Sequence, residues 1–252
     1  MAKKQLSFAQ KAAKKKGKSD IKYVKYVNSV RSEKTGQWRF NERMIGLEGG
    51  ESLDAALKRI EEEKKLLNIE KHNLQVYGYG IKGFILSLIE TSIEISDQKI
   101  NGSQIGTILD LGKKMFSEPI HLLENVEPTL RYLYQKYILL LITKGDLFEQ
   151  ETKISRSGLS KYFKYIEIVS EKDESTYSNI LKRHDIDPKV FLMVGNSLRS
   201  DILPVLKIGG HALHIPYKIT WDHEMEHPEI NPKHYTQIKN LGLLKSWLER
   251  MS

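Results

Sequence analysis

The stretch VFLMVGNSLRSDI, residues 190–202, holds the pattern that decides the fold. A mostly apolar run leads into Gly195, two small polar residues follow, and Asp201 lies a few positions into the next predicted helix. The order predicts a buried strand, a short turn and a helix that carries a carboxylate close to the turn. A carboxylate there is a candidate for function, because polar residues on loops that a rigid scaffold positions often bind ligands.

Three further apolar runs follow the same pattern. They are YILLLIT (137–143), YIEIV (165–169) and HALHIP (211–216), and helical stretches separate them. Continuously apolar strands that alternate with helices predict an α/β fold with a parallel sheet covered on both faces. In such sheets, ligands bind at the carboxyl ends of the strands.

Polar side chains stand after the strands of this predicted sheet. Thr143 ends the first strand, Lys172 follows the second, and Asn196 and Asp201 follow the third. Each alone has a structural explanation, as a helix cap, a solvated cation or a residue of a first helical turn. Their shared position at one rim favours a functional site.

The resemblance carried by these residues is to the haloacid dehalogenase (HAD) superfamily. LLLITKGD, SEKDESTY and VGNSLRSDI are similar to its second, third and fourth motifs, with 29 residues from Thr143 to Lys172 and 29 from Lys172 to Asp201. The similarity extends to YGYGIKGF in the cap region and to HIPYKITWDHE (214–224). It covers residues 68–250 and implies a Rossmann-like parallel sheet with a helical cap, most closely that of the phosphatase-like members.

The resemblance also implies a chemistry. Members transfer a phosphoryl group to an aspartate with the help of Mg²⁺, a reaction that depends on positioning and charge neutralisation. By analogy Thr143 contacts the phosphate of a small phosphorylated metabolite, Lys172 offsets negative charge, and Asp201 binds Mg²⁺. Asn196 lies where many relatives carry a second aspartate and would be a weaker metal ligand.

The first motif of the superfamily, an apolar strand ending in Asp-x-Asp-x-Thr, is not found. The only Asp-x-Asp is Asp185-Ile186-Asp187, which more plausibly caps or turns the chain. The family places that strand between the strands predicted at 137–143 and 190–195. Without it, two strand edges would lie unpaired, at a cost of about 1–3 kcal/mol per buried polar group. In the family this motif also supplies the aspartate that receives the phosphoryl group. An impaired or inactive phosphatase is therefore expected.

The amino-terminal segment differs in composition. Residues 1–43 hold 13 Lys and Arg against 3 Asp and Glu, whereas the remaining residues hold 27 against 29. Residues 21–30 and 38–45 predict a two-stranded hairpin, and a helix is expected from Ser52, its N-cap, to Leu67. The predicted organisation is a basic tail, hairpin and helix (1–67), a helical cap (68–126) and an α/β core (127–252).

A basic tail and a hairpin with Tyr23, Tyr26, Trp38 and Phe40 could bind RNA, and a solvated lysine tail is the equally simple alternative. Residues 1–66, with SEKTGQWRF as the best-matching stretch, resemble a family of small basic bacterial proteins thought to accompany the ribosome. The alternative to a phosphohydrolase is therefore a non-catalytic protein that binds RNA or the ribosome through residues 1–43 and carries a degenerate HAD scaffold.

Composition limits the remaining possibilities. The chain has no cysteine, which excludes disulfides and thiolate chemistry and fits a cytoplasmic protein. Its longest apolar runs are far below the roughly 20 residues that cross a bilayer, so no membrane span is expected. The histidine-rich stretch DHEMEHPE (222–229) lacks the spacing of a metalloprotease helix and is interpreted as a loop.

Overall fold

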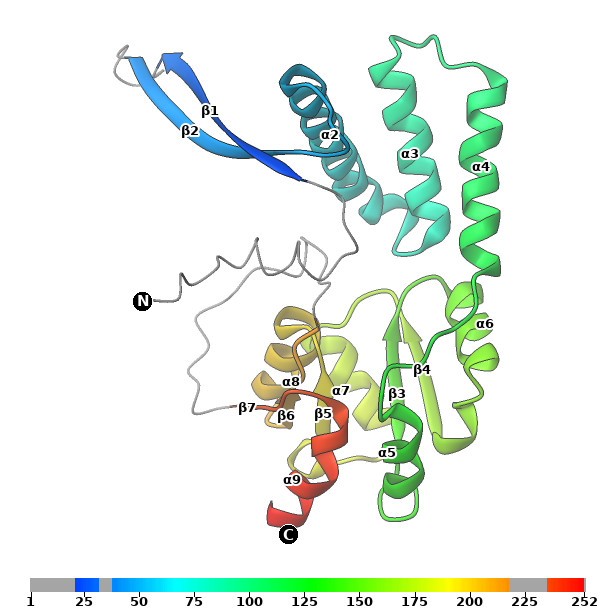
Figure 1. Cartoon of the computed structure of the whole chain (residues 1–252). Helices are drawn as coiled ribbons and strands as arrows, with labels where there is room; N and C mark the ends of the chain where they lie inside the picture. Colours follow the sequence, from blue (N-terminus) through cyan, green and yellow to red (C-terminus); the bar gives the residue numbers. More distant parts are fainter. Residues whose placement is uncertain (1–20, 32–37, 218–234, 252) are drawn as a thin grey trace, which may run out of the picture. The chain divides into compact units, whose positions relative to one another are not determined.

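The computed structural model describes residues 21–31, 38–217 and 235–251 of the chain. By their internal contacts the residues divide into two compact units, Met1–Ile69 and Glu70–Ser252, which are described separately. The smaller unit contains an antiparallel hairpin, and the larger one contains helices and parallel strands (Figure 1). The predicted fold class, an α/β protein with a helical cap and a small amino-terminal hairpin, is confirmed.

The hairpin consists of β1 (Lys22–Arg31) and β2 (Trp38–Leu47), paired antiparallel. The helix α2 (Leu53–Tyr77) follows, and the Ser52 hydroxyl accepts a hydrogen bond from the Ala55 amide at 3.2 Å, which confirms the predicted N-cap. The helix runs beyond the expected end at Leu67, because no glycine or proline interrupts the sequence before Gly78, which has a φ of 70°.

Arg59 of α2 joins the helix to the end of the hairpin. Its guanidinium donates to the Gly46 carbonyl at 3.2 Å and pairs with Glu51 at 2.8 Å. Ile45 of β2 and Ala56 of α2 are both buried, which gives this unit a small apolar core.

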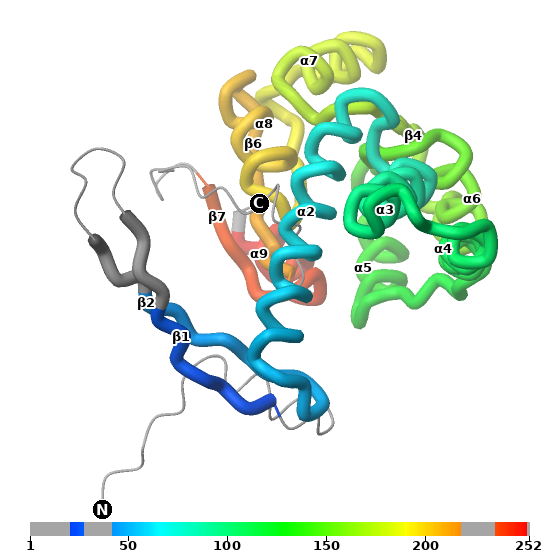
Figure 2. Tube along the Cα trace, turned by 90° about the horizontal axis from the view of Figure 1, so that it is seen from above, coloured from blue at the N-terminus to red at the C-terminus, as the bar shows by residue number. Residues whose placement is uncertain are grey.

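Two long helices begin the larger unit. The α3 helix (Ile81–Ile95) and the α4 helix (Gly102–Ser117) lie side by side in Figures 1 and 2. A Cβ on Gly112 would lie 2.8 Å from Ile85, so the glycine permits the close approach of the two helices. At the start of α4, the Asn101 and Gln104 side chains cap each other's backbone amides in a capping box.

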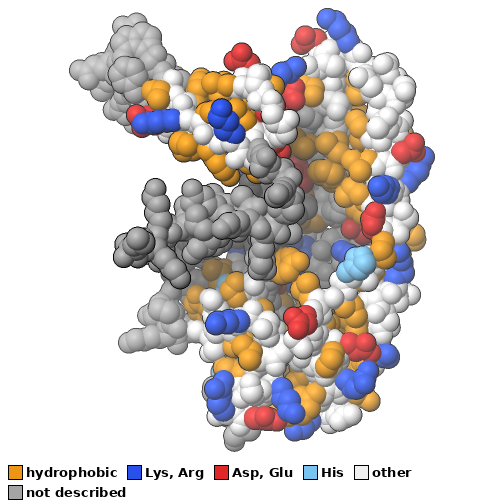
Figure 3. All heavy atoms as spheres, in the orientation of Figure 1, with side chains coloured by type: hydrophobic (Ala, Val, Ile, Leu, Met, Phe, Trp, Pro, Cys, Tyr) orange, Lys and Arg blue, Asp and Glu red, His pale blue; other side chains and the backbone are white. Residues whose placement is uncertain are grey.

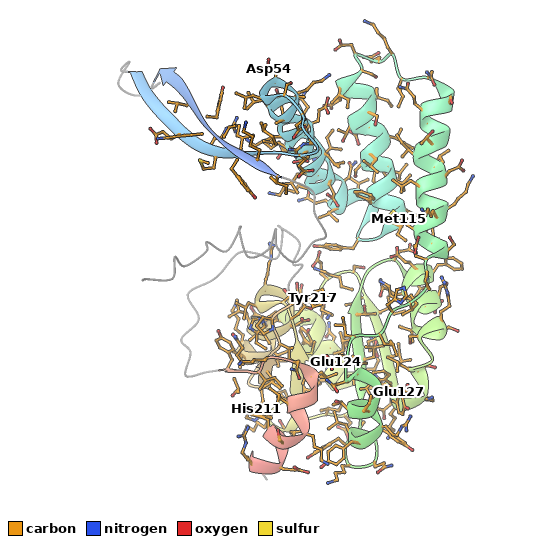
Figure 4. The ribbon with its side chains drawn as sticks, viewed as in Figure 1. Asp54, Met115, Glu124, Glu127, His211 and Tyr217 are labelled. Carbon is orange, nitrogen blue, oxygen red and sulfur yellow. The ribbon has the colours of Figure 1, made fainter. Side chains whose placement is uncertain are left out.

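Short parallel strands and the helices between them form the core. Its elements are α5 (Val126–Leu133), β3 (Leu140–Lys144), α6 (Leu147–Ser157), β4 (Tyr165–Val169), α7 (Glu174–Arg183), β5 (Leu192–Gly195), α8 (Leu203–Lys207), β6 (His211–His214), β7 (Thr236–Gln237) and α9 (Leu244–Met251). The predicted strand at 165–169 is confirmed residue for residue, and the other three predicted strands are shorter than their apolar runs. Figure 4 shows His211 at the start of β6 and Tyr217 beyond its other end, so the two labels mark the direction of the strand.

The strands form two separate parallel sets. β3 pairs with β4, and β5 pairs with β6, which pairs with β7. Within the described ranges, no strand joins β3 to β5. This is the break expected from the missing first motif, at the place where the sequence predicted it.

Two apolar layers cover the strands. On one side, Tyr177 and Ile180 of α7 and Val205 of α8 pack with Ile142 of β3 and Met193 of β5. On the other side, Leu133 of α5 and Leu244 of α9 pack with Leu139, Leu192 and Val194. Each layer therefore contacts both strand sets and extends across the break between them.

Some predicted features fall outside the described ranges. The stretch 222–229 lies there, as do the side chains of Trp38 and Phe40. The Asp-x-Asp at 185–187 is a turn, as predicted: Asp185 has a φ of 53°, and the Asp187 carboxylate accepts from the Lys189 amide at 2.9 Å. Over the part of the chain that was searched, no helix has both the length and the apolar character of a membrane span.

Candidate active site

Lys172 and Asp201 form the centre of the candidate site. Lys172 follows β4, Asp201 lies in the π-helical turn after β5 (Leu198–Ile202), and Lys172 Nζ donates to Asp201 Oδ1 at 2.8 Å. Only 12% of the lysine side chain and 5% of the aspartate side chain are exposed. The sequence placed both residues at one rim, and the structure brings them into direct contact.

The turn after β5 is built around the Asp201 carboxylate. Its Oδ2 accepts from the Ser197 amide at 3.0 Å, and a Cβ added to Gly195 would collide with the same oxygen. The Ser197 hydroxyl accepts from the Ser200 amide at 3.0 Å, which caps the turn. The strand therefore ends in glycine because the carboxylate occupies the space of a side chain.

Tyr177 of α7 holds this turn in place through a hydrogen bond to its backbone. Its hydroxyl donates to the Ser200 carbonyl at 3.0 Å, and the side chain is fully buried. Burial raises the pKa of the Tyr177 phenol, and the negative charge of Asp201 raises it further. Tyr177 therefore stays neutral and acts as a hydrogen-bond donor to the backbone next to Asp201.

Thr143 lies at the rim, but its hydroxyl is engaged elsewhere. It donates to Gln150 Oε1 of α6 at 2.9 Å, and Gln150 is buried. The structure does not bring Thr143 into hydrogen-bond contact with Lys172 or Asp201. A contact with phosphate, as the resemblance implies, would require the hydroxyl to exchange its partner.

Asn196 precedes the turn with an exposed side chain. Its backbone carbonyl lies 3.0 Å from Nε2 of the buried His214, whose Nδ1 lies 3.3 Å from Gln237 Oε1. The sequence did not single out His214, which ends β6 and orients the loop of Asn196. Among the described contacts, the carboxylate of Asp201 accepts from Lys172 and from the Ser197 amide and not from the Asn196 side chain.

Lys144 is a further cation at the rim, which the sequence noted only as the neighbour of Thr143. Its Nζ donates to the Ser200 hydroxyl at 3.3 Å, lies 3.7 Å from Glu171 and stands 4.0 Å above the Tyr79 ring. Only 11% of the Lys144 side chain is exposed. Two largely buried ammonium groups therefore flank the turn that carries Asp201.

The loop before α3 is tied to the first turn of α6, just beyond β3. The Asp146 amide donates to the Tyr79 carbonyl at 2.9 Å, and the Ile81 amide donates to Glu149 Oε2 at 2.8 Å. Lys82 pairs with Asp146 at 2.7 Å and lowers the pKa of that carboxyl. A Cβ on Gly80, which has a φ of 141°, would lie 2.7 Å from Glu149 Oε2.

The described donors fit a weakly held Mg²⁺ and do not form a complete site. Asp201 is a buried carboxylate at the rim, and each of its oxygens accepts one hydrogen bond, which leaves lone pairs for a cation. Over the residues searched, no three His, Asp or Glu side chains gather as metal ligands. Mg²⁺ often binds through one or two carboxylates together with substrate phosphate and water, and this arrangement suits the donors present.

Solved structures resemble this chain in sequence and fold. A haloacid dehalogenase-like family hydrolase from Xanthomonas campestris is 37% identical over 74% of this chain and 75% of its own, with a TM-score of 0.65. A 2-haloacid dehalogenase from Pseudomonas syringae pv. Tomato DC3000 is 20% identical over 75% of this chain and 81% of its own, with a TM-score of 0.52. A predicted phosphoglycolate phosphatase from Haemophilus somnus 129pt is 14% identical over 73% of this chain and 91% of its own, with a TM-score of 0.50. No family model and no curated protein matches the sequence.

The identity and coverage of the Xanthomonas structure show the family, and the other two structures show the fold. The parallel strands, the helical cap and the rim after β4 and β5 agree with that assignment. This chain belongs to the haloacid dehalogenase-like family of hydrolases.

Proposed function

We propose that the site binds phosphate monoesters together with Mg²⁺, as a phosphatase-type member of the family. The observation that carries the proposal is the buried contact of Lys172 with Asp201 at 2.8 Å, with Lys144 close by. Two ammonium groups suit a phosphate dianion. A buried carboxylate in the same place would repel that anion unless a divalent cation lay between them, which favours a phosphatase over a metal-independent dehalogenase.

Each residue has a defined part in this proposal. Lys172 and Lys144 neutralise phosphate charge, and Asp201 with bound phosphate and water holds Mg²⁺, which would draw negative charge away from the phosphoryl group. Asn196, exposed beside the turn, offers an amide oxygen to a metal-bound water. Thr143 reaches the phosphate if its hydroxyl leaves Gln150. The substrate class is a small phosphorylated metabolite.

Turnover is a separate matter from binding. Phosphoryl transfer in the family begins with a carboxylate nucleophile, and none of the described carboxylates other than Asp201 contacts Lys172. Asp173 caps α7 through the Thr176 amide, and Asp146 pairs with Lys82. We therefore infer that the chain alone binds phosphate and hydrolyses esters slowly or not at all.

Two measurements test the two halves of this proposal. Phosphate with Mg²⁺ is expected to raise the melting temperature of the wild type and not that of Asp201→Ala, whereas Lys182→Met, a change at an exposed lysine of α7, should behave as the wild type. Equal shifts for wild type and Asp201→Ala would refute the binding site. The wild type should hydrolyse p-nitrophenyl phosphate with Mg²⁺ no faster than Asp201→Ala does. A rate that depends on Asp201 would show that the chain is an active phosphatase and refute the second half of the proposal.

A second candidate function, RNA or ribosome binding through residues 1–43, is favoured by the hairpin surface. Tyr23, Lys25 and Val27 alternate along β1 as exposed side chains, and Met44 of β2 is also exposed. Figure 3 shows apolar and basic side chains next to one another on this part of the surface. The exposed Tyr23 lies between Lys22 and Lys25 and suits stacking on a base, while Lys25, which pairs with Glu42, would have to change its partner to contact a phosphate.

Salt dependence distinguishes this second function from a solvated basic tail. RNA affinity should fall steeply between low and physiological salt, because binding releases counterions from the phosphates. It should be lost when residues 1–43 are removed and weakened by Tyr23→Ala. Binding that persists without residues 1–43, or that is insensitive to salt, would contradict the assignment.

A further inference from the structure

His214 is a buried histidine to which the proposed function assigns no part. It ends β6, and only 8% of the residue is exposed. Its backbone is fixed on both sides of the strand. The Gly195 carbonyl of β5 accepts from the Ile215 amide at 2.8 Å, and the His214 carbonyl accepts from the Ile238 amide at 3.0 Å. A buried ring on a fixed backbone can hold the group that it contacts in one orientation.

Both ring nitrogens of His214 lie close to a polar group. Nε2 lies 3.0 Å from the Asn196 carbonyl oxygen, and Nδ1 lies 3.3 Å from Oε1 of Gln237 in β7. A carbonyl oxygen can only accept, so a hydrogen bond to Asn196 requires a proton on Nε2. The Gln237 amide has both an oxygen and an NH₂ group and can turn either of them toward Nδ1. The surroundings of the ring therefore suit an imidazole that donates to Asn196.

The Asn196 carbonyl and the Ser197 amide belong to one peptide group. A trans peptide is rigid and points its C=O and its N–H to opposite sides. The C=O of this peptide faces His214, and its N–H donates to Asp201 Oδ2 at 3.0 Å. A donor at the carbonyl polarises the peptide and strengthens the hydrogen bond that the amide makes. His214 can therefore act on the Asp201 carboxylate through a single peptide group.

The carboxylate is held at its other oxygen as well. Lys172 Nζ donates to Asp201 Oδ1 at 2.8 Å, so each oxygen has a donor from a different segment of the chain. The two donors restrain the rotation of the carboxylate, and its remaining lone pairs keep fixed directions. Removing a group that orients a metal ligand typically lowers metal affinity by about 10- to 100-fold.

We infer that His214 is a positioning residue for the carboxylate that binds Mg²⁺. It holds the Asn196–Ser197 peptide, and this peptide in turn keeps its amide on Asp201 Oδ2. The effect on Mg²⁺ rests on the proposed function, whereas the hold on the peptide rests on the contacts of His214 alone.

His211 provides a matched contrast on the same strand. It begins β6, at the end away from the candidate site (Figure 4), and its Nε2 lies 3.1 Å from the Lys189 carbonyl. The contact is of the same kind as that of His214, but Lys189 precedes β5 and does not belong to the turn of Asp201. Replacing His211 therefore removes a histidine from β6 without touching the site.

Mg²⁺ affinity tests the inference in the full chain. His214→Phe keeps a buried ring and removes both nitrogens, and it is expected to weaken Mg²⁺ binding by about tenfold or more. Isothermal titration in the presence of inorganic phosphate measures the affinity. His214→Gln retains an amide NH₂ that can donate to the Asn196 carbonyl, so it should recover most of the loss. His211→Phe should bind Mg²⁺ as the wild type does.

Hydrogen exchange tests the hold on the peptide without any ligand. In His214→Phe the Ser197 amide should exchange about tenfold faster than in the wild type, the factor expected for one lost hydrogen bond. The Gln150 amide, which donates to the Asp146 carbonyl at the start of α6, should keep its rate. Acceleration of both amides to the same extent, or of neither, would show that His214 only fills space and would overturn the inference.

Two binding results would also overturn it. One is a His214→Phe variant that binds Mg²⁺ as tightly as the wild type, and the other is a His214→Gln variant that binds no better than His214→Phe. A wild type that does not bind Mg²⁺ would refute the proposed function instead. The exchange of the Ser197 amide would then decide alone whether His214 positions Asp201.

Discussion

The ammonium of Lys172 and the carboxylate of Asp201, 29 residues apart in sequence, lie 2.8 Å from each other at the end of the two strand sets. Lys172 follows β4 and Asp201 follows β5, so this pair links the loops of two sheets that share no backbone hydrogen bond within the described residues. It defines the centre of the site and closes the rim across the break.

Removing the lysine would leave a buried charge without its partner. Lys172→Met is expected to lower the free energy of unfolding by about 3–5 kcal/mol, the usual cost of breaking a buried pair on one side. Chemical denaturation measures the change. The matched control Lys182→Met, at an exposed position, should stay within about 0.5 kcal/mol of the wild type.

Combining Lys172→Met with Asp201→Asn separates charge from packing. The double variant should lose less stability than the sum of the two single variants, because neither charge is then left alone. Additive losses, or a Lys172→Met variant as stable as the wild type, would contradict a paired site.

Gly195 is expected to tolerate no side chain. Gly195→Ala places a Cβ in collision with Asp201 Oδ2, so the turn must move, at a cost of about 1–3 kcal/mol. Gly106→Ala in α4, where a Cβ meets nothing within 4 Å, should instead add about 0.5–1 kcal/mol. Thermal unfolding of the two variants compares them directly, and similar melting temperatures would show that Asp201 does not fill this space.

Tyr177→Phe removes one hydrogen bond and keeps the packing. The Ser200 carbonyl loses its buried donor, which should lower the free energy of unfolding by about 1–3 kcal/mol. Tyr77→Phe, at an exposed tyrosine, is the control and should change little. If the variant were as stable as the wild type, the hydroxyl would not support the turn.

Glu70 gives a prediction about pH. Burial raises the pKa of its carboxyl, so the unfolded chain releases the proton at a lower pH than the folded chain does. Glu70 therefore costs stability as the pH rises from the unfolded to the folded pKa, and the cost remains above both. Glu70→Gln should melt at a higher temperature than the wild type at pH 7 and at the same temperature at pH 3.

An exposed carboxylate serves as the control for that measurement. Glu94→Gln on α3 should have nearly the same melting temperature as the wild type at both pH values. A Glu70→Gln variant that is less stable at pH 7 would mean that the ionised carboxylate makes a favourable contact in the folded chain.

The sequence predicted those features that depend on local pattern. The predicted strand YIEIV coincides with β4, because a polar residue stands directly before and directly after this mostly apolar run. Lys172 and Asp201 were assigned to one rim, because the carboxyl ends of parallel strands meet there. The missing motif predicted that the strand between β3 and β5 would be absent, and in the described part of the chain β3 and β5 belong to separate sheets.

Contacts between distant residues could not be predicted in this way. Lys144 reaches Ser200 over 56 positions, and Glu149 caps Ile81 over 68, and neither pair has a spacing that reveals it. The bond from Thr143 to Gln150 depends on the direction of one hydroxyl. The helix α2 ends at Tyr77 and not at Leu67 as predicted, because no helix-breaking residue precedes Gly78.

The attachment of α3 to α6 has a mechanical consequence. Glu149 holds the first amide of α3, Asp146 holds both Lys82 and the Tyr79 carbonyl, and all of these contacts lie within a few residues of Thr143. A rotation of α3 about Gly80 would therefore break the Ile81–Glu149 hydrogen bond and the Lys82–Asp146 ion pair together, while the bond from the Asp146 amide to the Tyr79 carbonyl holds the residue before Gly80 in place. These contacts fix the start of α3 to the residues that directly follow β3, so a displacement at that end of the strand would be passed on to the helix.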